Sequence, residues 1–330
     1  SGGAAKRSAE MTRQLAAAVV GLSLASAGAV ADDELVVTAP ATAVGDGRPA
    51  SAISVSGGPS PLDGERRRNP ARAWLDCKSG HTLPAIDRQP PAVVAPAART
   101  RTTLPCTAHL RGASKSFSIA VATPPAGLYA ALPAGVKATD GEVELDVFVA
   151  DGKGGTRSAN DLRAAASAGT VRVKGSRVVL TLPKSNAPRT VAVVLRERTL
   201  TGAVFIPVAG VTTLEVKTRR NATLTLRIAG REFGPWPAPT GKVDAPIVVP
   251  AGVAKATARA VSKKGFANEK EIDLRIPAFP SAAVLADSAV VGTKTTLWVA
   301  AATRRGDPQD QLKTSVDLGS LGPPRKLGPG

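Results

Sequence analysis

One pattern recurs three times along this chain and constrains its fold more than any other feature. Each copy has an alternating apolar segment, a polar turn and a later strand that closes with a glycine. The opening segments lie at residues 46–55, 140–149 and 292–299. The closing glycines, Gly80, Gly169 and Gly319, are separated by 89 and then by 150 residues. This spacing predicts a module of about 90 residues, with a smaller module inserted before the last copy.

The composition restricts the kind of core that such modules can build. Of the 330 residues, 43% are hydrophobic but only 3% are aromatic, so the cores must consist of valine, alanine, leucine and isoleucine. These residues suit thin β-sandwiches, and 32 glycines and 27 prolines supply the turns that short strands need. The length suits about three domains. The sequence therefore predicts an all-β chain of tandem antiparallel β-sandwich modules.

The repeat also predicts where the modules begin and end. Residues 32–116 form a first, irregular module with basic loops, and residues 117–212 form a second module. Residues 213–277 form a smaller inserted sandwich, and residues 278–330 the start of a truncated third copy.

Two local patterns predict individual strands. From Val143 to Val149 apolar residues alternate with mostly acidic ones, which is typical of a strand with one buried face. Residues 161–166 are rich in alanine and have helix propensity, but their repeat partner at 311–316 does not. Because repeat partners share a structure, we expect both segments to be strands.

Residues 1–31 have the three parts of a secretory signal peptide. Basic residues precede an apolar run that ends in Ala29-Val30-Ala31, and acidic residues follow from Asp32. We expect cleavage after Ala31, with the residues before Met11 as an N-terminal extension. An uncleaved membrane anchor is the alternative, although about 17 apolar residues are marginal for spanning a bilayer. The mature chain is expected to be exported, to the periplasm, the cell surface or the medium, without a transmembrane segment.

The chain carries a formal charge of +17, and of +15 without residues 1–31. This surplus favours anionic partners, such as anionic polysaccharide, lipopolysaccharide phosphates or released nucleic acid, without specific nucleic-acid recognition. Charge dispersed for solubility is the alternative. The candidate polyanion-binding residues belong to the first module and are Arg66, Arg67, Arg68, Arg72, Arg99, Arg101 and Arg111.

A family resemblance rests on the order of short motifs in the second module. An Asp140-Gly141 turn, an alternating strand, the loop at 151–155 and the segment Ser167–Val171 follow one another. This order resembles the bacterial immunoglobulin-like domains of the invasin and intimin type, best at residues 128–210, weaker at 283–321 and faint at 35–116. The resemblance implies tandem immunoglobulin-like sandwiches that act as spacers or adhesive segments of surface proteins. It carries over no catalytic residue.

Cys77 and Cys106 are the two cysteines of the chain, and in an exported protein they predict one disulfide. His81 and His109 lie close to them in sequence, so a zinc site of four ligands is an alternative, as are free thiols. On a strand, however, His109 would leave the face that Cys106 occupies, because the two are three residues apart.

Few other residues predict chemistry. Trp236 lies in a proline-flanked aromatic loop at 233–237, where it would either stack on a sugar or partner ring or pack over the end of a sandwich. The carboxylates of Asp140, Glu142 and Asp151 would suit calcium, or simply a solvated strand face. Asn221 begins a glycosylation sequon. No serine nucleophile elbow or phosphate-binding loop is found, so no catalytic residue, cofactor or metal is expected.

These observations predict an exported, non-enzymatic protein of tandem immunoglobulin-like sandwiches. It would act as a spacer or adhesive segment at a bacterial cell envelope, with a protein or anionic surface partner. Two alternatives stay open. One is a polyanion- or carbohydrate-binding module that uses the arginines and Trp236. The other is an accessory region of a larger enzyme or outer-membrane protein that continues beyond residue 330.

Overall fold

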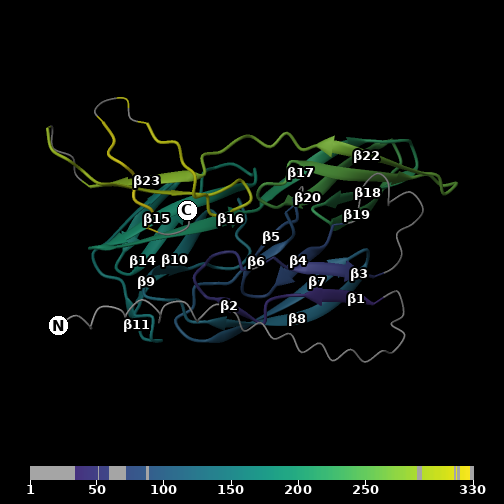
Figure 1. Cartoon of the computed structure of the whole chain (residues 1–330). Coiled ribbons are helices and arrows are strands. Elements are labelled where there is room, and N and C mark those ends of the chain that lie inside the picture. Colours follow the sequence, from purple (N-terminus) through teal and green to yellow (C-terminus); the bar gives the residue numbers. More distant parts are fainter. Residues whose placement is uncertain are drawn as a thin grey trace, which may run out of the picture. The chain divides into compact units, whose positions relative to one another are not determined.

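The computed structural model describes residues 34–50, 52–58, 72–86, 89–287, 292–315, 317 and 320–327. Over these residues the chain is all-β, as predicted: it forms strands β1 to β24 and no helix (Figure 1). Accordingly, this part of the chain contains no helix that is long and apolar enough to cross a membrane. The predicted signal peptide at residues 1–31 lies outside the described residues.

Strands β9 to β16 form the most regular unit, which we call the second sandwich. Its strands are β9 (Gly127–Ala131), β10 (Glu142–Ala150), β11 (Thr156–Ser158), β12 (Leu162–Ala166), β13 (Thr170–Lys174), β14 (Arg177–Thr181), β15 (Arg189–Glu197) and β16 (Leu200–Val208). One sheet has the order β11-β10-β14-β13, with β9 also paired to β10, and the other has the order β12-β15-β16. The two sheets share one core, in which Leu145, Val147 and Leu180 are fully buried. The predicted alternation from Val143 onward therefore does place an apolar face in a core.

The segment at 167–169 carries the chain from one sheet of the second sandwich to the other. The backbone N–H of Ser167 donates to the carbonyl of Ala192 at 2.8 Å, and its hydroxyl accepts from the N–H of Ala192 at 3.0 Å. Gly169 has a φ of +84°, and a Cβ there would lie 2.2 Å from the carbonyl oxygen of Thr181. Only glycine fits such a position. The motif that carried the family resemblance thus has a structural explanation.

Strands β1 to β8 form the first sandwich. They are β1 (Leu35–Thr38), β2 (Thr42–Val44), β3 (Ser54–Gly57), β4 (Trp74–Cys77), β5 (His81–Leu83), β6 (Ala92–Val94), β7 (Thr102–Leu110) and β8 (Ala113–Ala122). A sheet of order β2-β8-β7-β4 faces the pairs β1-β3 and β5-β6, and β2 is parallel to β8. Leu35, Ile53, Val93, Leu104 and Ile119 contribute to its buried core.

Strands β17 to β22 form the third sandwich, which is drawn in green in Figure 1. They are β17 (Gly210–Lys217), β18 (Ala222–Ile228), β19 (Arg231–Ala238), β20 (Lys242–Val249), β21 (Lys255–Val261) and β22 (Ala267–Asp273). The pair β17-β20 packs on a sheet of order β19-β18-β21-β22, and Leu224, Leu226 and Ile247 lie in the core between them.

The third sandwich corrects two expectations. The segment at 233–237 is part of strand β19 and not a loop, with a register irregularity between Leu224 and Leu226 of its neighbour β18. Strand β21 was not predicted, and a strand was expected at 272–276, whereas β22 ends at Asp273. The sequence gives no sign of β22 before residue 272, because this is an exposed edge strand without apolar alternation that carries Glu269, Lys270 and Glu271. Charged residues are a common protection of edge strands against pairing with other chains.

The C-terminal hairpin consists of β23 (Ala282–Ala286) and β24 (Leu297–Ala301), paired antiparallel. The expected strand at 311–316 is wrong, since the described residues 311–315 belong to no strand and are exposed. Its repeat partner β12 is a strand as expected, because β15 lies beside it and supplies backbone partners from Leu162 to Ala166. A strand at 311–315 has no such neighbour among the described residues.

Candidate functional site

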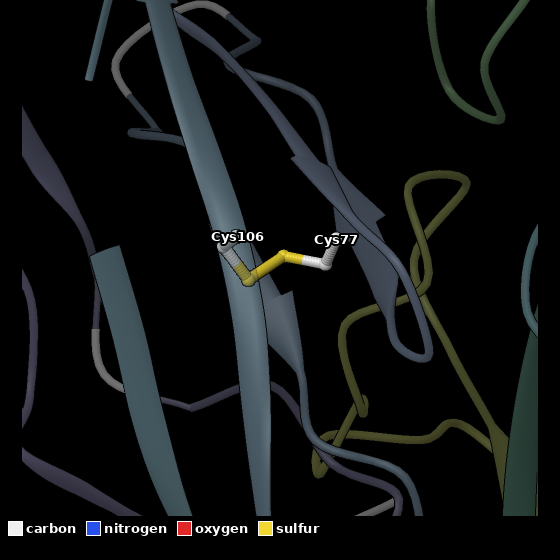
Figure 2. The surroundings of a disulfide bond; sticks show 2 residues. All are labelled: Cys77 and Cys106. Carbon is white, nitrogen blue, oxygen red and sulfur yellow. A yellow bond between two sulfur atoms is a disulfide. The ribbon is translucent and has the colours of Figure 1, made fainter. Parts of the chain in front are cut away.

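Cys77 and Cys106 form the predicted disulfide, which Figure 2 shows between strands β4 and β7. The two cysteines stand directly opposite each other in the antiparallel register, with their Cα atoms 4.1 Å apart. Both side chains point into the core of the first sandwich. The bond joins neighbouring strands of one sheet, and so differs from the bond between sheets that antibody domains contain.

The two histidines are not zinc ligands in this fold, because both cysteines are consumed by the disulfide. His109 lies across from Trp74 on strand β4, and their rings stack with centroids 3.8 Å apart. His81 is buried, its Nε2 has no hydrogen-bond partner among the described residues, and burial lowers its pKa. No group of three or more metal-ligating side chains occurs in the described part of the chain.

Four of the seven candidate polyanion-binding arginines lie in the described part of the chain. Arg66, Arg67 and Arg68 lie outside the described residues. Arg72 donates from Nη1 to the carbonyl of Ala85 at 3.1 Å, and Arg99 is paired with Asp146. Arg101 and Arg111 are exposed. Polyanion binding by this set stays a prediction.

Trp236 and the candidate calcium ligands are engaged in local structure. Trp236 is half-buried and packs against the core of the third sandwich. Asp151 accepts the backbone N–H groups of Lys153 and Gly155 at 2.7 and 2.9 Å, which makes the turn after β10. Asp140 likewise accepts the N–H of Lys137, and the carboxylate of Glu142 accepts from Arg172.

A salt bridge at Arg99 joins the first sandwich to the second. Its guanidinium donates two hydrogen bonds from Nη2 and one from Nε to the carboxylate of Asp146, at 3.0–3.1 Å. The same group lies 4.9 Å from the ring centroid of Phe148, which is fully buried with Ala97 and Tyr129. Phe148 was expected on a mostly acidic outer face of β10. Instead, this face is covered at Phe148 by a segment of the first sandwich.

A turn after β24 contains a buried arginine in an ion pair. The side chain of Arg305 is 8% exposed and pairs with Asp307 at 2.7 Å. Its Nη1 also donates to the carbonyls of Pro84 and Pro90, at 3.1 and 2.7 Å, in the first sandwich. Burial works to raise the pKa of Asp307, but hydrogen bonds and charge from Arg305 outweigh it and hold the pKa below its ordinary value.

The neighbouring residue ties the same turn to the second sandwich. The hydroxyl of Thr190 on β15 donates to the carbonyl of Arg304 at 2.9 Å. Sequence reasoning missed this turn. The pattern Thr303 to Asp307 has the residues of a tight turn, but nothing in it indicates partners more than 100 positions away.

Two further contacts join the first and third sandwiches. Arg231 on β19 lies 5.5 Å from the ring centroid of Trp74, which is within the range of a cation–π contact. Beside it, Gly230 has a φ of +91°, and a Cβ there would lie 2.1 Å from the carbonyl oxygen of Arg72. The close approach of the two backbones therefore requires glycine at 230.

The second sandwich meets its other neighbours without a long linker. A single residue, Ala209, separates β16 from β17, and its N–H donates to the carbonyl of Val136 at 2.9 Å. The C-terminal hairpin packs Ala283, Leu285 and Ala300 against Phe205 and its neighbours on the β12-β15-β16 sheet.

Charged contacts secure the hairpin as well. Arg163 and Arg196 of the second sandwich both donate to the carboxylate of Asp287, and the guanidinium of Arg196 lies 3.8 Å from the ring centroid of Trp298. Apolar and ionic contacts therefore both hold the C-terminal hairpin to the second sandwich.

A cavity with a volume of about 340 Å³ lies between the first and third sandwiches. Its charged lining consists of Arg72, Arg227, Lys255 and Glu271, and the last two form a salt bridge at 2.6 Å. No histidine, cysteine or serine lines it. Besides these charged groups, the lining offers the hydroxyl of Thr257.

No protein-family model matches the sequence, and no curated protein matches it. Among solved structures, immunoglobulin domains 1–4 of Sidekick-1 are 15% identical over 70% of this chain and 72% of that one, with a TM-score of 0.18. Extracellular domains 3–5 of Drosophila OTK are 8% identical over 74% and 98%, with a TM-score of 0.21. The insect immune protein hemolin is 10% identical over 72% and 75%, with a TM-score of 0.20.

Because these TM-scores are low, the fold class of this chain is defined by its own sheets and cores. These define an all-β protein of tandem immunoglobulin-like antiparallel β-sandwiches. The Sidekick-1 structure consists of immunoglobulin domains, and none of the three structures named above is of the invasin or intimin type. That closer resemblance stays a prediction from the sequence motifs.

Proposed function

We propose that the chain is an exported, non-enzymatic spacer or adhesive segment of a bacterial cell envelope, built from the modules at 32–116, 117–212, 213–277 and 278–330. The observation that carries the proposal is the set of contacts between the sandwiches. A spacer must hold a partner-binding element at a fixed position, and this requires that its modules do not move freely. Flexible glycine- and serine-rich linkers would defeat this purpose.

The contacts fix the sandwiches by several independent means. Arg99 with Asp146 and Phe148 holds the first to the second, and Arg231 with Trp74 holds the first to the third. The one-residue connection at Ala209 leaves little freedom between the second and the third. Single exposed ion pairs contribute only about 0–1 kcal/mol, so the combination of charge, ring contacts and short connections matters more than any one pair.

The disulfide supports the proposed location outside the cytoplasm. Structural disulfides persist in oxidising compartments and are rare where glutathione keeps thiols reduced. The signal-like sequence at residues 1–31 points to the same compartment. The non-enzymatic part of the proposal is supported by the sequence, in which no serine nucleophile elbow and no phosphate-binding loop is found.

Expression of the complete chain in a bacterium tests the proposed export. Material recovered outside the cytoplasm should begin at Asp32, because the sequence Ala29-Val30-Ala31 fits a signal-peptidase site. N-terminal sequencing and thiol alkylation of each cell fraction measure the two expected products, a processed N-terminus and an oxidised pair of cysteines. A chain that stays in the cytoplasm with residues 1–31 attached would contradict the proposal.

A further inference from the structure

One end of the third sandwich gathers cations from three turns around an exposed phenylalanine. We call this set the basic tip, and it consists of Lys217, Arg219, Arg220, Lys242, Lys263, Lys264 and Phe266. All seven residues are exposed. The tip lies apart from the arginines of the first module in sequence, and no part of the proposed spacer role depends on it.

The strand register places the turns together. Lys217 and Lys242 are paired across β17 and β20, at the ends of these strands. The turn that holds Arg219 and Arg220 leads into β18, whose Thr223 is paired with Val261 at the end of β21. The hairpin loop at 262–266 follows β21 directly. The third turn, at 239–241, leads from β19 into β20 at Lys242. All three turns therefore lie at the same end of this sandwich.

Hydrogen bonds fix the backbone conformation of these turns. The N–H of Thr218 donates to the carbonyl of Gly241 at 2.8 Å, which joins two of the turns. In the hairpin loop the N–H of Ser262 donates to the carbonyl of Phe266 at 2.9 Å, and the hydroxyl of Ser262 accepts the N–H of Phe266 at 3.1 Å. The loop thus has a fixed backbone that presents two lysines and a phenylalanine to solvent.

Phe266 is exposed without a structural reason. Its exposed fraction is 72%, the largest of any bulky apolar side chain in the described chain, and it lies beyond the end of the core. An exposed ring costs hydration free energy that burial would recover. A single exposed apolar residue is common on protein surfaces, so it is the position of Phe266 beside Lys263 and Lys264 on one hairpin loop that indicates a contact surface.

The tip also keeps most of its charge unneutralised. Lys242 is bonded to Glu215 at 2.7 Å, and Asp244 lies opposite Glu215 two pairs deeper in the sandwich. Within the described residues no ion pair is formed by Lys217, Arg219, Arg220, Lys263 or Lys264. Lys217 stands directly opposite Lys242, and Glu215 interacts electrostatically with both lysines. In the described part of the chain, the cations of the other two turns have no such carboxylate in an ion pair and so are available to an anionic partner.

We propose that the basic tip docks on an anionic lipid surface, with Phe266 entering the interface and the cations meeting lipid phosphates. Basic side chains near an anionic bilayer gain attraction from its surface potential, and an apolar residue gains by leaving water for the headgroup boundary. A soluble polyanion would satisfy the cations but not Phe266. The combination of the two therefore favours a lipid surface over a polysaccharide chain.

Sedimentation with vesicles tests the proposal on purified residues 32–330, independently of whether the chain is exported in cells. The chain should sediment with vesicles of phosphatidylcholine and phosphatidylglycerol, and not with phosphatidylcholine alone. Lys263→Ala should weaken binding about five-fold, and the double variant with Lys264→Ala about 25-fold. Phe266→Ala should weaken vesicle binding several-fold but leave retention on heparin unchanged.

A matched control separates the tip from the overall charge. Lys174→Ala with Lys184→Ala removes the same charge from exposed positions of the second sandwich and should change binding less than two-fold. Equal losses from the control pair would overturn the proposal in favour of dispersed charge. Vesicle binding that Phe266→Ala leaves unchanged would overturn it in favour of a soluble polyanion, and failure of the wild-type chain to bind would overturn it outright. Thermal melts identical to wild type should accompany every variant, since the altered side chains are exposed.

Discussion

Replacing Val147 with aspartate should unfold the second sandwich at room temperature. Val147 is fully buried in the core between its two sheets, on the central strand β10. An unpaired carboxylate there costs several kcal/mol, against a total stability of about 5–15 kcal/mol for a typical domain. Hydrogen exchange read by mass spectrometry should show loss of protection throughout β9 to β16.

A substitution at an exposed position of the same sandwich is the control for this experiment. Val173→Asp changes the same residue type in the same sandwich, but Val173 is 38% exposed, so the fold should tolerate it. The third sandwich has a core of its own, and its strands β17 to β22 should keep their protection when the second unfolds. Equal effects of the two substitutions, or loss of protection in both sandwiches together, would show that the second sandwich is not a separate cooperative unit.

Removing the disulfide should destabilise the first sandwich by about 3–4 kcal/mol, because the bond closes a loop of about 30 residues. The cysteines are 29 positions apart and face each other on β4 and β7. Urea unfolding of Cys77→Ala with Cys106→Ala, followed by exchange over β1 to β8, measures the loss. Changing both residues avoids leaving a free thiol in the core.

The second sandwich contains no cysteine and supplies the internal reference. Its unfolding midpoint should stay unchanged in the double variant and in wild-type chain treated with a reductant. An unchanged midpoint for the first sandwich, or two free thiols in the oxidised wild-type protein, would refute the stabilising role of the bond.

The regular part of the fold could be predicted from local patterns. Alternation at Val143 to Val147 predicted a strand with one buried face, and this signal depends on neighbours in sequence alone. Strand β12 was expected from its repeat partner at 311–316, but the described residues of that partner form no strand, so the pairing of β12 with β15 explains it instead. Strand β22 gave no such signal, because an exposed edge strand needs only one partner strand and no buried face.

Contacts between the sandwiches could not be predicted, for a different reason. Asp146 lies 47 positions from Arg99, and Pro84 lies 221 positions from Arg305, so no local pattern links the partners. Arg99 was predicted as a candidate polyanion-binding residue. Whether its charge is available to a partner depends on Asp146, which the sequence does not place beside it. The cysteines were paired correctly because the chain offers one pairing.

Phe266 illustrates a third kind of limit. Its sequence surroundings, Lys263-Lys264-Gly265, predict a turn but not whether the next residue enters a core. Exposure follows from the position of the hairpin at the uncovered end of the third sandwich, which depends on the pairing of all six strands.

Small-angle X-ray scattering of residues 32–330 tests most directly whether the sandwiches form one fixed unit. A single conformer should fit the wild-type scattering curve at low and at high salt. The reason is that ionic contacts such as those of Arg305, apolar contacts and short connecting segments together hold the sandwiches in place. Arg305→Ala should broaden the distance distribution, whereas Arg304→Ala should not, since the exposed Arg304 is held through its backbone carbonyl. A wild-type curve that only an ensemble of freely moving sandwiches can fit would contradict the account.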